Sequence, residues 1–186
     1  RKSYPVLRKD TEAGILLTAQ EIKSSSSATV WRFTGDDAAG WQVSLSSGFV
    51  ALQVPRYTSR REFLGRLRQV VEAAHSAFHP ASYDRLGVRY IDRFEQESQA
   101  RMRHLVRPDV AGIVGQPLGS QKASLTHSVT DSVFALGAGD TLRARWGWLP
   151  ANATIDPTLE PAKTPSWILD LDMYREQSRP FEVEGI

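Results

Sequence analysis

The chain has 186 residues, of which 41% are hydrophobic and 24% charged, a composition typical of a globular domain and unlike that of a disordered or fibrous protein. Its 23 basic and 21 acidic residues nearly balance, which makes a nucleic-acid partner unlikely. The absence of cysteine excludes disulfides and cysteine-ligated metals, and no apolar run is long enough to span a membrane, so we expect a cytoplasmic protein with no membrane segment.

The two ends of the chain indicate a partial or trimmed protein. The chain starts at Arg1 instead of methionine, and no signal peptide is visible. Residues 1–10 combine basic residues with Pro5, so we expect an exposed leading segment there. On length, residues 1–186 predict a single domain.

Residues 28–54 carry the strongest β signal in the first third of the chain. A short strand or buried segment is expected over 14–22, and the serine run 24–27 favours a turn, a polar strand edge or a flexible loop. Strands are then expected over 30–33, 41–45 and 49–54, with turns over 35–40 and 46–48. Together they predict an antiparallel meander.

A long amphipathic helix is predicted over residues 59–79. Ser59 and Glu62 have the spacing of a capping box, in which a side chain accepts an otherwise unpaired backbone N–H. Apolar residues then recur at helical spacing, and Pro80 ends the pattern. The apolar stripe runs from Phe63 to Phe78, and we expect five of its residues to pack on a sheet: Phe63, Leu67, Val70, Val71 and Ala74.

The strand predicted over residues 85–94 has one apolar and one basic face. Leu86, Val88 and Tyr90 alternate with Arg85, Gly87 and Arg89, which is the period of a strand. Arg93 continues the basic face. We expect this strand to rejoin the sheet formed by residues 28–54.

The second half of the chain is also rich in β signals. Residues 95–107 are polar and fit a short helix or a loop, and glycines favour a loop over 108–121. Alternating patterns predict strands over 124–130 and 142–148 around a turn at 137–140. The proline-rich stretch 150–165 predicts a loop, and residues 166–174 a last strand.

These elements together predict an α+β fold. We expect a twisted antiparallel sheet of about six to eight strands with the long helix packed on one face. An open sheet leaves strand edges unpaired, so we also expect a protein partner or a homo-oligomer.

Several of these motifs resemble a sporadically distributed family of uncharacterised prokaryotic proteins. The resemblance covers 30–94 best and the last strand moderately, and Asp92 departs from it, since the family favours asparagine there. The family has no assigned activity and therefore supplies no catalytic residues. It implies that roughly 20–30 residues precede Arg1 and that a segment follows Ile186. The matching motifs are Trp31-Arg32-Phe33, Phe49-Val50-Ala51-Leu52, Tyr57-Thr58-Ser59, Glu62-Phe63, Arg85-Leu86-Gly87-Val88-Arg89-Tyr90-Ile91-Asp92-Arg93 and Ile168-Leu169-Asp170-Leu171-Asp172.

No motif in the chain predicts a metal, a cofactor or a nucleophile. His75 and His79 have zinc-ligand spacing, but Ser76 stands where a zincin carries glutamate. The glycines of 112–119 match neither a P-loop nor a dinucleotide-binding fingerprint, and there is no G-x-S-x-G. We therefore expect no metal, no cofactor and no catalytic residue.

Two other groups of residues are candidate binding sites. Arg85, Arg89 and Arg93 share one strand face, and Asp170 and Asp172 share a face of the last strand, so the two sets are candidates for an interaction face or for pairing with each other. Four tryptophans are candidates for a ligand pocket or for the sheet core: Trp31, Trp41, Trp146 and Trp148.

The function expected from the sequence is non-enzymatic binding or regulation through protein–protein contact. One alternative is an enzyme or small-ligand binder with a site between the sheet and loop 108–121. A second is nucleic-acid binding through the Arg85, Arg89 and Arg93 face, which a steep salt dependence of affinity would reveal.

Overall fold

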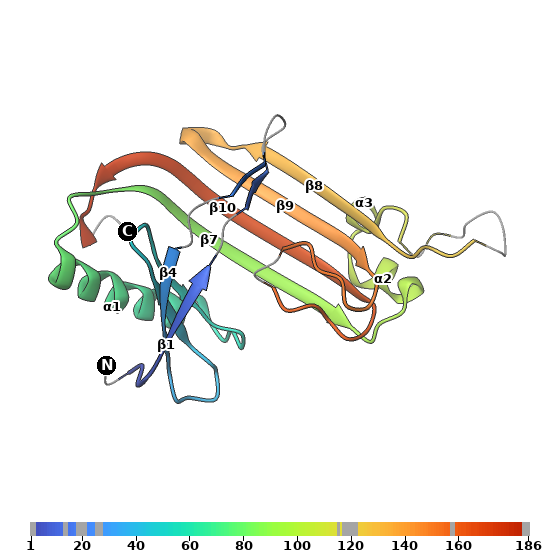
Figure 1. Ribbon diagram of the computed structural model, residues 1–186. Coiled ribbons are helices and arrows are strands. Elements are labelled where there is room, and N and C mark those ends of the chain that lie inside the picture. The colour runs from blue at the N-terminus through green and yellow to red at the C-terminus, as the bar shows by residue number, and fades with distance from the viewer. Residues whose placement is uncertain are drawn as a thin grey trace. The chain divides into compact units, whose positions relative to one another are not determined.

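The chain divides into two compact units, Arg1–Ser82 with Pro180–Ile186 and Tyr83–Arg179. The computed structural model describes residues 3–12, 15–17, 22–24, 28–114, 116, 123–156 and 159–183 (Figure 1). Each unit contains an antiparallel sheet of four strands, and one helix is much longer than the others. The predicted α+β class is therefore confirmed, with the strands distributed over two sheets.

The N-terminal sheet has the strand order β1-β4-β5-β6. Its strands are β1 (Val6–Glu12), β4 (Ala28–Thr34), β5 (Gln42–Leu45) and β6 (Val50–Gln53). The last three form the predicted meander. The exposure expected for residues 1–10 is confirmed at Val6 and Leu7, which are both exposed. The chain is nevertheless a strand from Val6 onwards, because β1 pairs with β4 and places Leu7 opposite Phe33.

A short pair of strands, β2 (Ile15–Leu17) and β3 (Ile22–Ser24), follows β1. These strands fall within and next to the segment 14–22, where a strand was predicted. In the serine run 24–27, Ser24 belongs to β3, and residues 25–27 lie outside the described residues.

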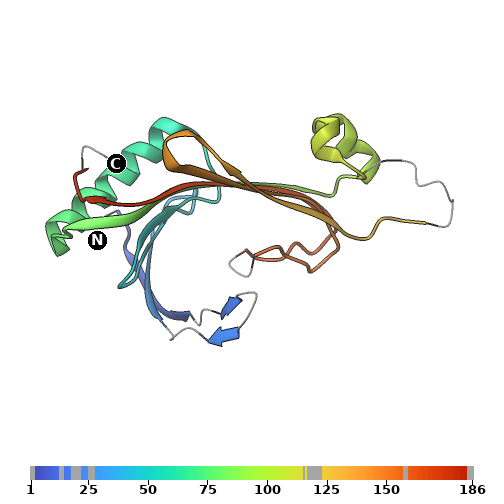
Figure 2. The same ribbon diagram turned by 90° about the horizontal axis from the view of Figure 1, so that it is seen from above.

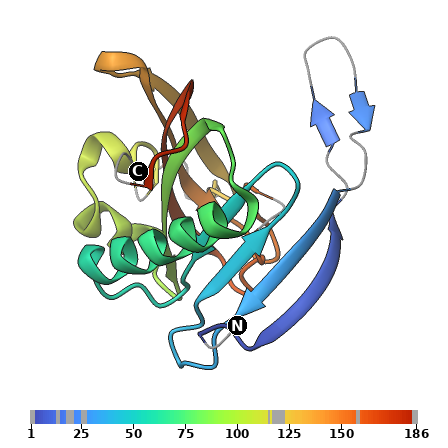
Figure 3. The same ribbon diagram turned by 90° about the vertical axis from the view of Figure 1, so that its left-hand side faces the viewer.

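The helix α1 (Arg60–Phe78) begins and ends where the sequence predicts. The Ser59 hydroxyl accepts the Glu62 N–H at 3.2 Å, and His79 adopts a left-handed conformation with φ of 46° just before Pro80. α1 lies beside β6, and Phe63 packs on Trp41 with 5.9 Å between ring centroids (Figure 3). The most buried residues of its apolar stripe are Val70, Val71 and Ala74.

Substitutions on two faces of α1 test this packing. Leu67 is half-buried, so Leu67→Ala should lower the free energy of unfolding by about 2 kcal/mol, the low end of the range for leucine truncation. Gly65 has open space where a Cβ would stand, so Gly65→Ala should raise it by roughly 0.5–1 kcal/mol through helix propensity. Chemical denaturation measures both, and equal effects of the two changes would contradict the orientation of the helix.

The C-terminal sheet has the strand order β7-β10-β9-β8. Its strands are β7 (Ser82–Glu95), β8 (Ser128–Ala135), β9 (Asp140–Leu149) and β10 (Ser166–Pro180), and the short η1 (Gly137–Gly139) joins β8 to β9. The expectation that the strand over 85–94 returns to the first sheet is wrong, because β7 pairs with β10. Both are long strands, of 14 and 15 residues, so pairing them satisfies more backbone groups than pairing β7 with β5 or β6, of four residues each.

The two faces of the C-terminal sheet differ in chemistry. Helices α2 (Gln99–Leu105) and α3 (Pro108–Ala111) lie on one face, and the described part of the loop 150–165 lies on the other (Figure 2). The core beneath the helices contains Met102, Val114, Trp148 and Trp167. The prediction of an irregular loop over 108–121 is thus wrong at its start, because Pro108 at the first position of α3 favours a helical turn.

Candidate functional site

The strand registers of the C-terminal sheet bring its charged residues onto one face. Asp170 lies opposite Arg145 and Asp172 opposite Arg143, in the pairing of β10 with β9. Residues directly opposite each other in an antiparallel pair project to the same side. The alternate positions, including Trp146 and Trp148, project to the apolar side.

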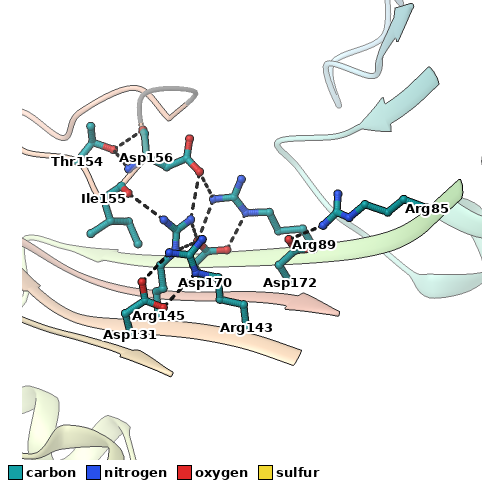
Figure 4. A network of polar contacts seen from close by, with 10 residues as sticks. All are labelled: Arg85, Arg89, Asp131, Arg143, Arg145, Thr154, Ile155, Asp156, Asp170 and Asp172. Carbon is teal, nitrogen blue, oxygen red and sulfur yellow. Dashed lines mark hydrogen bonds and ion pairs between the residues drawn. The ribbon is translucent and has the colours of Figure 1, made fainter. Parts of the chain in front are cut away.

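The carboxylate of Asp170 is the centre of this charged face. Its oxygens accept hydrogen bonds from Arg89 Nε at 2.7 Å and Nη2 at 2.8 Å, a bidentate pair, and from Arg145 Nη2 at 2.6 Å (Figure 4). The Asp170 side chain is only 1% exposed. A buried carboxylate is stable in its ionised form only when charged donors surround it, and two arginines do so here.

A second carboxylate, that of Asp156, completes the group from the loop 150–165. It accepts hydrogen bonds from Arg89 Nη2 at 2.8 Å and Arg145 Nη2 at 3.1 Å. Arg145 also donates to the Ile155 carbonyl at 3.0 Å. We call Arg89, Arg145, Asp156 and Asp170 the central network. It holds residues 155 and 156 of this loop on the sheet and balances two positive charges with two negative ones.

Further ion pairs flank the central network on the same face. Arg85 donates to Asp172 at 3.0 Å, and Arg143 donates to Asp131 at 3.0 and 2.6 Å. The predicted pairing of the arginines of β7 with Asp170 and Asp172 is therefore confirmed for Arg85 and Arg89. The pairing with Asp170 raises the pKa of Arg89 above the usual arginine value, chiefly through the hydrogen bonds to its carboxylate.

A double-mutant cycle measures this pairing directly. We expect Arg89→Ala and Asp170→Ala to be coupled by about 0.5–3 kcal/mol in the free energy of unfolding, because each removes the partner of the other. The cycle of Arg89→Ala with Asp172→Ala should be additive within about 0.5 kcal/mol, since Asp172 accepts from Arg85 and Arg89 donates to Asp170 and Asp156. Additivity in both cycles, measured by denaturant titration, would remove the pairing.

Two ion pairs outside the central network make stability depend on pH, the flanking pair of Asp131 with Arg143 and a separate pair of Asp140 with Arg175. Hydrogen bonds from Arg143 lower the pKa of Asp131, and hydrogen bonds from Arg175 lower the pKa of Asp140. Because the folded protein binds these protons less readily than the unfolded chain, this stabilisation is present above the unfolded pKa near 3.9 and is lost as the pH falls through the lower folded value. Asp131→Asn should cost about 0.2–1 kcal/mol at pH 7 and progressively less below about pH 4. Denaturation of both proteins across this range measures the difference, and a constant cost would contradict the pairing.

Arg93, the third arginine of the predicted face, has a different environment. Its Nη1 donates to the Glu160 carbonyl at 2.7 Å, and its buried Nε finds no acceptor among the described residues. It lines an open depression of about 390 Å³. Lys163 adds a second positive charge there and Glu95 and Glu160 add negative ones, so the depression does not select a ligand by charge.

The four candidate tryptophans do not form one group. Trp41 is buried in the N-terminal unit, and Trp31, on β4, is 38% exposed with Lys9 Nζ 5.4 Å from its ring centroid. Trp148 is buried in the core of the C-terminal unit, and Trp146 packs against that core. Three of the four thus belong to a core, which was the alternative prediction to a ligand pocket.

His75 of α1 and His79, which follows the helix, interact with aromatic rings. His75 stacks on Phe181 at 6.0 Å and meets His79 edge to face at 6.0 Å. Across the described ranges, no three histidine, aspartate or glutamate side chains gather as a metal site would require. In the same part of the chain, no helix combines the length and apolarity needed to cross a membrane.

Comparison of the chain with protein families, with curated proteins and with solved structures found no match. Sequence reasoning missed two of the four members of the central network, Arg145 and Asp156. The alternation of Arg143 and Arg145 with tryptophans was a usable signal for the first, whereas Asp156 lies in an irregular loop where no period indicates its direction.

Proposed function

We propose that the chain is a non-enzymatic binding module that acts through protein–protein contact, and that β8 makes this contact. β8 is an edge of the C-terminal sheet, and in the described part of the chain it pairs only with β9. An edge strand presents a row of unpaired backbone donors and acceptors, to which an extended segment of a partner can add as a further strand.

Comparison with the other sheet edges supports this assignment. Charged side chains and a neighbouring helix are both common means of blocking strand addition at a sheet edge. β1 and β7 carry several charged residues each, and α1 lies beside β6. β8 has one charged residue, Asp131, and this residue is paired with Arg143. Among the edges of the two four-stranded sheets, β8 is the one with neither kind of protection.

The apolar residues of β8 provide the observation that carries the proposal. Val133 is 66% exposed and Phe134 46%, although a partly buried strand usually directs such residues to the core. They lie on opposite faces of the strand, since adjacent residues alternate. A partner strand added to this edge would cover part of both.

The alternative functions have less support. Arg85 and Arg89 are engaged by carboxylates of the same chain, so a nucleic acid would have to displace these partners. The small-ligand alternative required a site beside loop 108–121, and in the described part of that segment Ala111 and Val114 are buried. The absence of cysteine fits the cytoplasmic location that we include in the proposal.

Photocrosslinking at β8 tests the proposed contact in cells that express the chain. Phe134 is replaced by p-benzoylphenylalanine, which preserves an exposed aromatic ring. We expect a discrete adduct with another protein chain, which mass spectrometry then identifies.

The matched control places the same crosslinker at Phe78 of α1, which is 61% exposed. An adduct from position 134 that is absent from position 78 supports the contact. No intermolecular adduct from position 134, or the same adducts from both positions, would overturn the proposed function.

A further inference from the structure

The sequence of β8 is suited to pairing with itself. Its single charge, on Asp131, is neutralised by two hydrogen bonds from Arg143, so two copies of the strand bring no uncompensated charge together. It contains no proline, and each copy has exposed apolar side chains on both faces. A contact made by the same patch on both chains closes after two copies.

We propose that the partner of β8 is β8 of a second copy of this chain, paired antiparallel about a two-fold axis at Val133. This inference rests on the proposed function and names its partner. An axis at Val133 places that valine opposite the same residue of the second copy and Ser132 opposite Phe134 of the second copy. Asp131 then faces Ala135, and residues 131–135 of the two strands overlap.

Neighbouring registers are less favourable. An axis at Asp131 would place two aspartates directly opposite each other, and an axis at Ser132 would place Val133 opposite an aspartate. An axis at Phe134 would leave only residues 133–135 overlapping, because β8 ends at Ala135. The axis at Val133 pairs the most exposed apolar residue of the strand with itself while retaining a longer ladder.

A charge exchange at position 133 tests both the partner and the register. Analytical ultracentrifugation of the wild-type chain should show a monomer–dimer equilibrium. Val133→Lys and Val133→Glu each place like charges opposite one another, so each alone should raise the dimer dissociation constant by roughly a hundredfold or more. An equimolar mixture of the two variants should form a heterodimer, because lysine then faces glutamate.

Val6 provides the matched control, since it is a 45% exposed valine on the edge strand β1. Val6→Lys and Val6→Glu should leave the equilibrium unchanged, and thermal melts verify that all four variants fold. A wild type that is monomeric at every concentration overturns the pairing. It is also overturned by a dimer that both Val133 variants retain, or by variants that stay monomeric when mixed.

The two proposals can fail independently. If crosslinking from Phe134 captures a different protein while the wild-type chain stays monomeric, the contact at β8 stands and the second copy is wrong as its partner. If crosslinking from Phe134 captures nothing, the proposed function itself fails.

Discussion

Replacing Asp170 by alanine should lower the free energy of unfolding by about 3–5 kcal/mol, the range for removing one member of a buried ion pair. The side chain is 1% exposed, and its loss leaves Arg89 and Arg145, which are 29% and 14% exposed, with Asp156 as their remaining carboxylate. The two guanidinium groups would then repel each other at a partly buried site, where water screens their charges little. We expect the loop 150–165 to loosen as well, because Asp156 is held by the same two arginines.

Asp172→Ala is the matched control for this substitution. Asp172 lies on the same face of β10, but its side chain is 26% exposed and its partner Arg85 is 49% exposed. Pairs that water reaches contribute little, so this change should cost less than about 1 kcal/mol. Urea denaturation followed by tryptophan fluorescence compares the two variants, and similar losses would contradict a central role for Asp170.

Replacing Gly147 by alanine should lower the free energy of unfolding by more than about 4 kcal/mol, a loss that only a few mechanisms produce. A Cβ at this position would stand 1.9 Å from the Ser128 carbonyl oxygen and 2.9 Å from the Val129 Cα. Both atoms belong to the backbone of β8, so no side-chain rotation relieves the collision. The φ of 149° at Gly147 adds strain, since residues with a Cβ rarely adopt it.

This substitution also links folding to the proposed contact. Val129 lies opposite Gly147 in the β8–β9 register, so β8 must move away from β9 to accept the alanine. We expect Gly147→Ala to weaken dimer formation as well as stability. Gly137→Ala is the control, because no atom lies within 4 Å of its added Cβ, and it should change stability by no more than about 0.5 kcal/mol.

Much of the secondary structure could be predicted because local signals determine it. The cap at Ser59 and the proline after His79 mark the ends of α1 to within a residue. The strands β4, β5, β6, β7 and β9 follow apolar alternation and the turns between them. β1 was missed because its charged residues resemble a solvent-exposed tail, and its strand character comes from pairing with β4, a long-range contact.

The division into two sheets and the complete central network could not be predicted from the sequence. The pairing of β7 depends on the length and register of β10. Apolar alternation does not mark the extension of β10 to Pro180, so this pairing could not be predicted. The alternation of Arg85 and Arg89 did predict a charged face, and the D-x-D predicted its partners. Asp156 joins them from an irregular loop, so its position follows from the folded structure alone.

Amide hydrogen exchange of β8, measured as a function of protein concentration, tests the central claim most directly. If β8 pairs with β8 of a second copy, the amides of residues 131–135 that point away from β9 gain protection as the concentration rises, because these groups face water in the monomer and become hydrogen-bonded in the dimer. The amides of the edge strand β1 in the same molecule should exchange at a rate that does not depend on protein concentration. Exchange of β8 that does not change with concentration, or that changes equally in β1, would contradict the account.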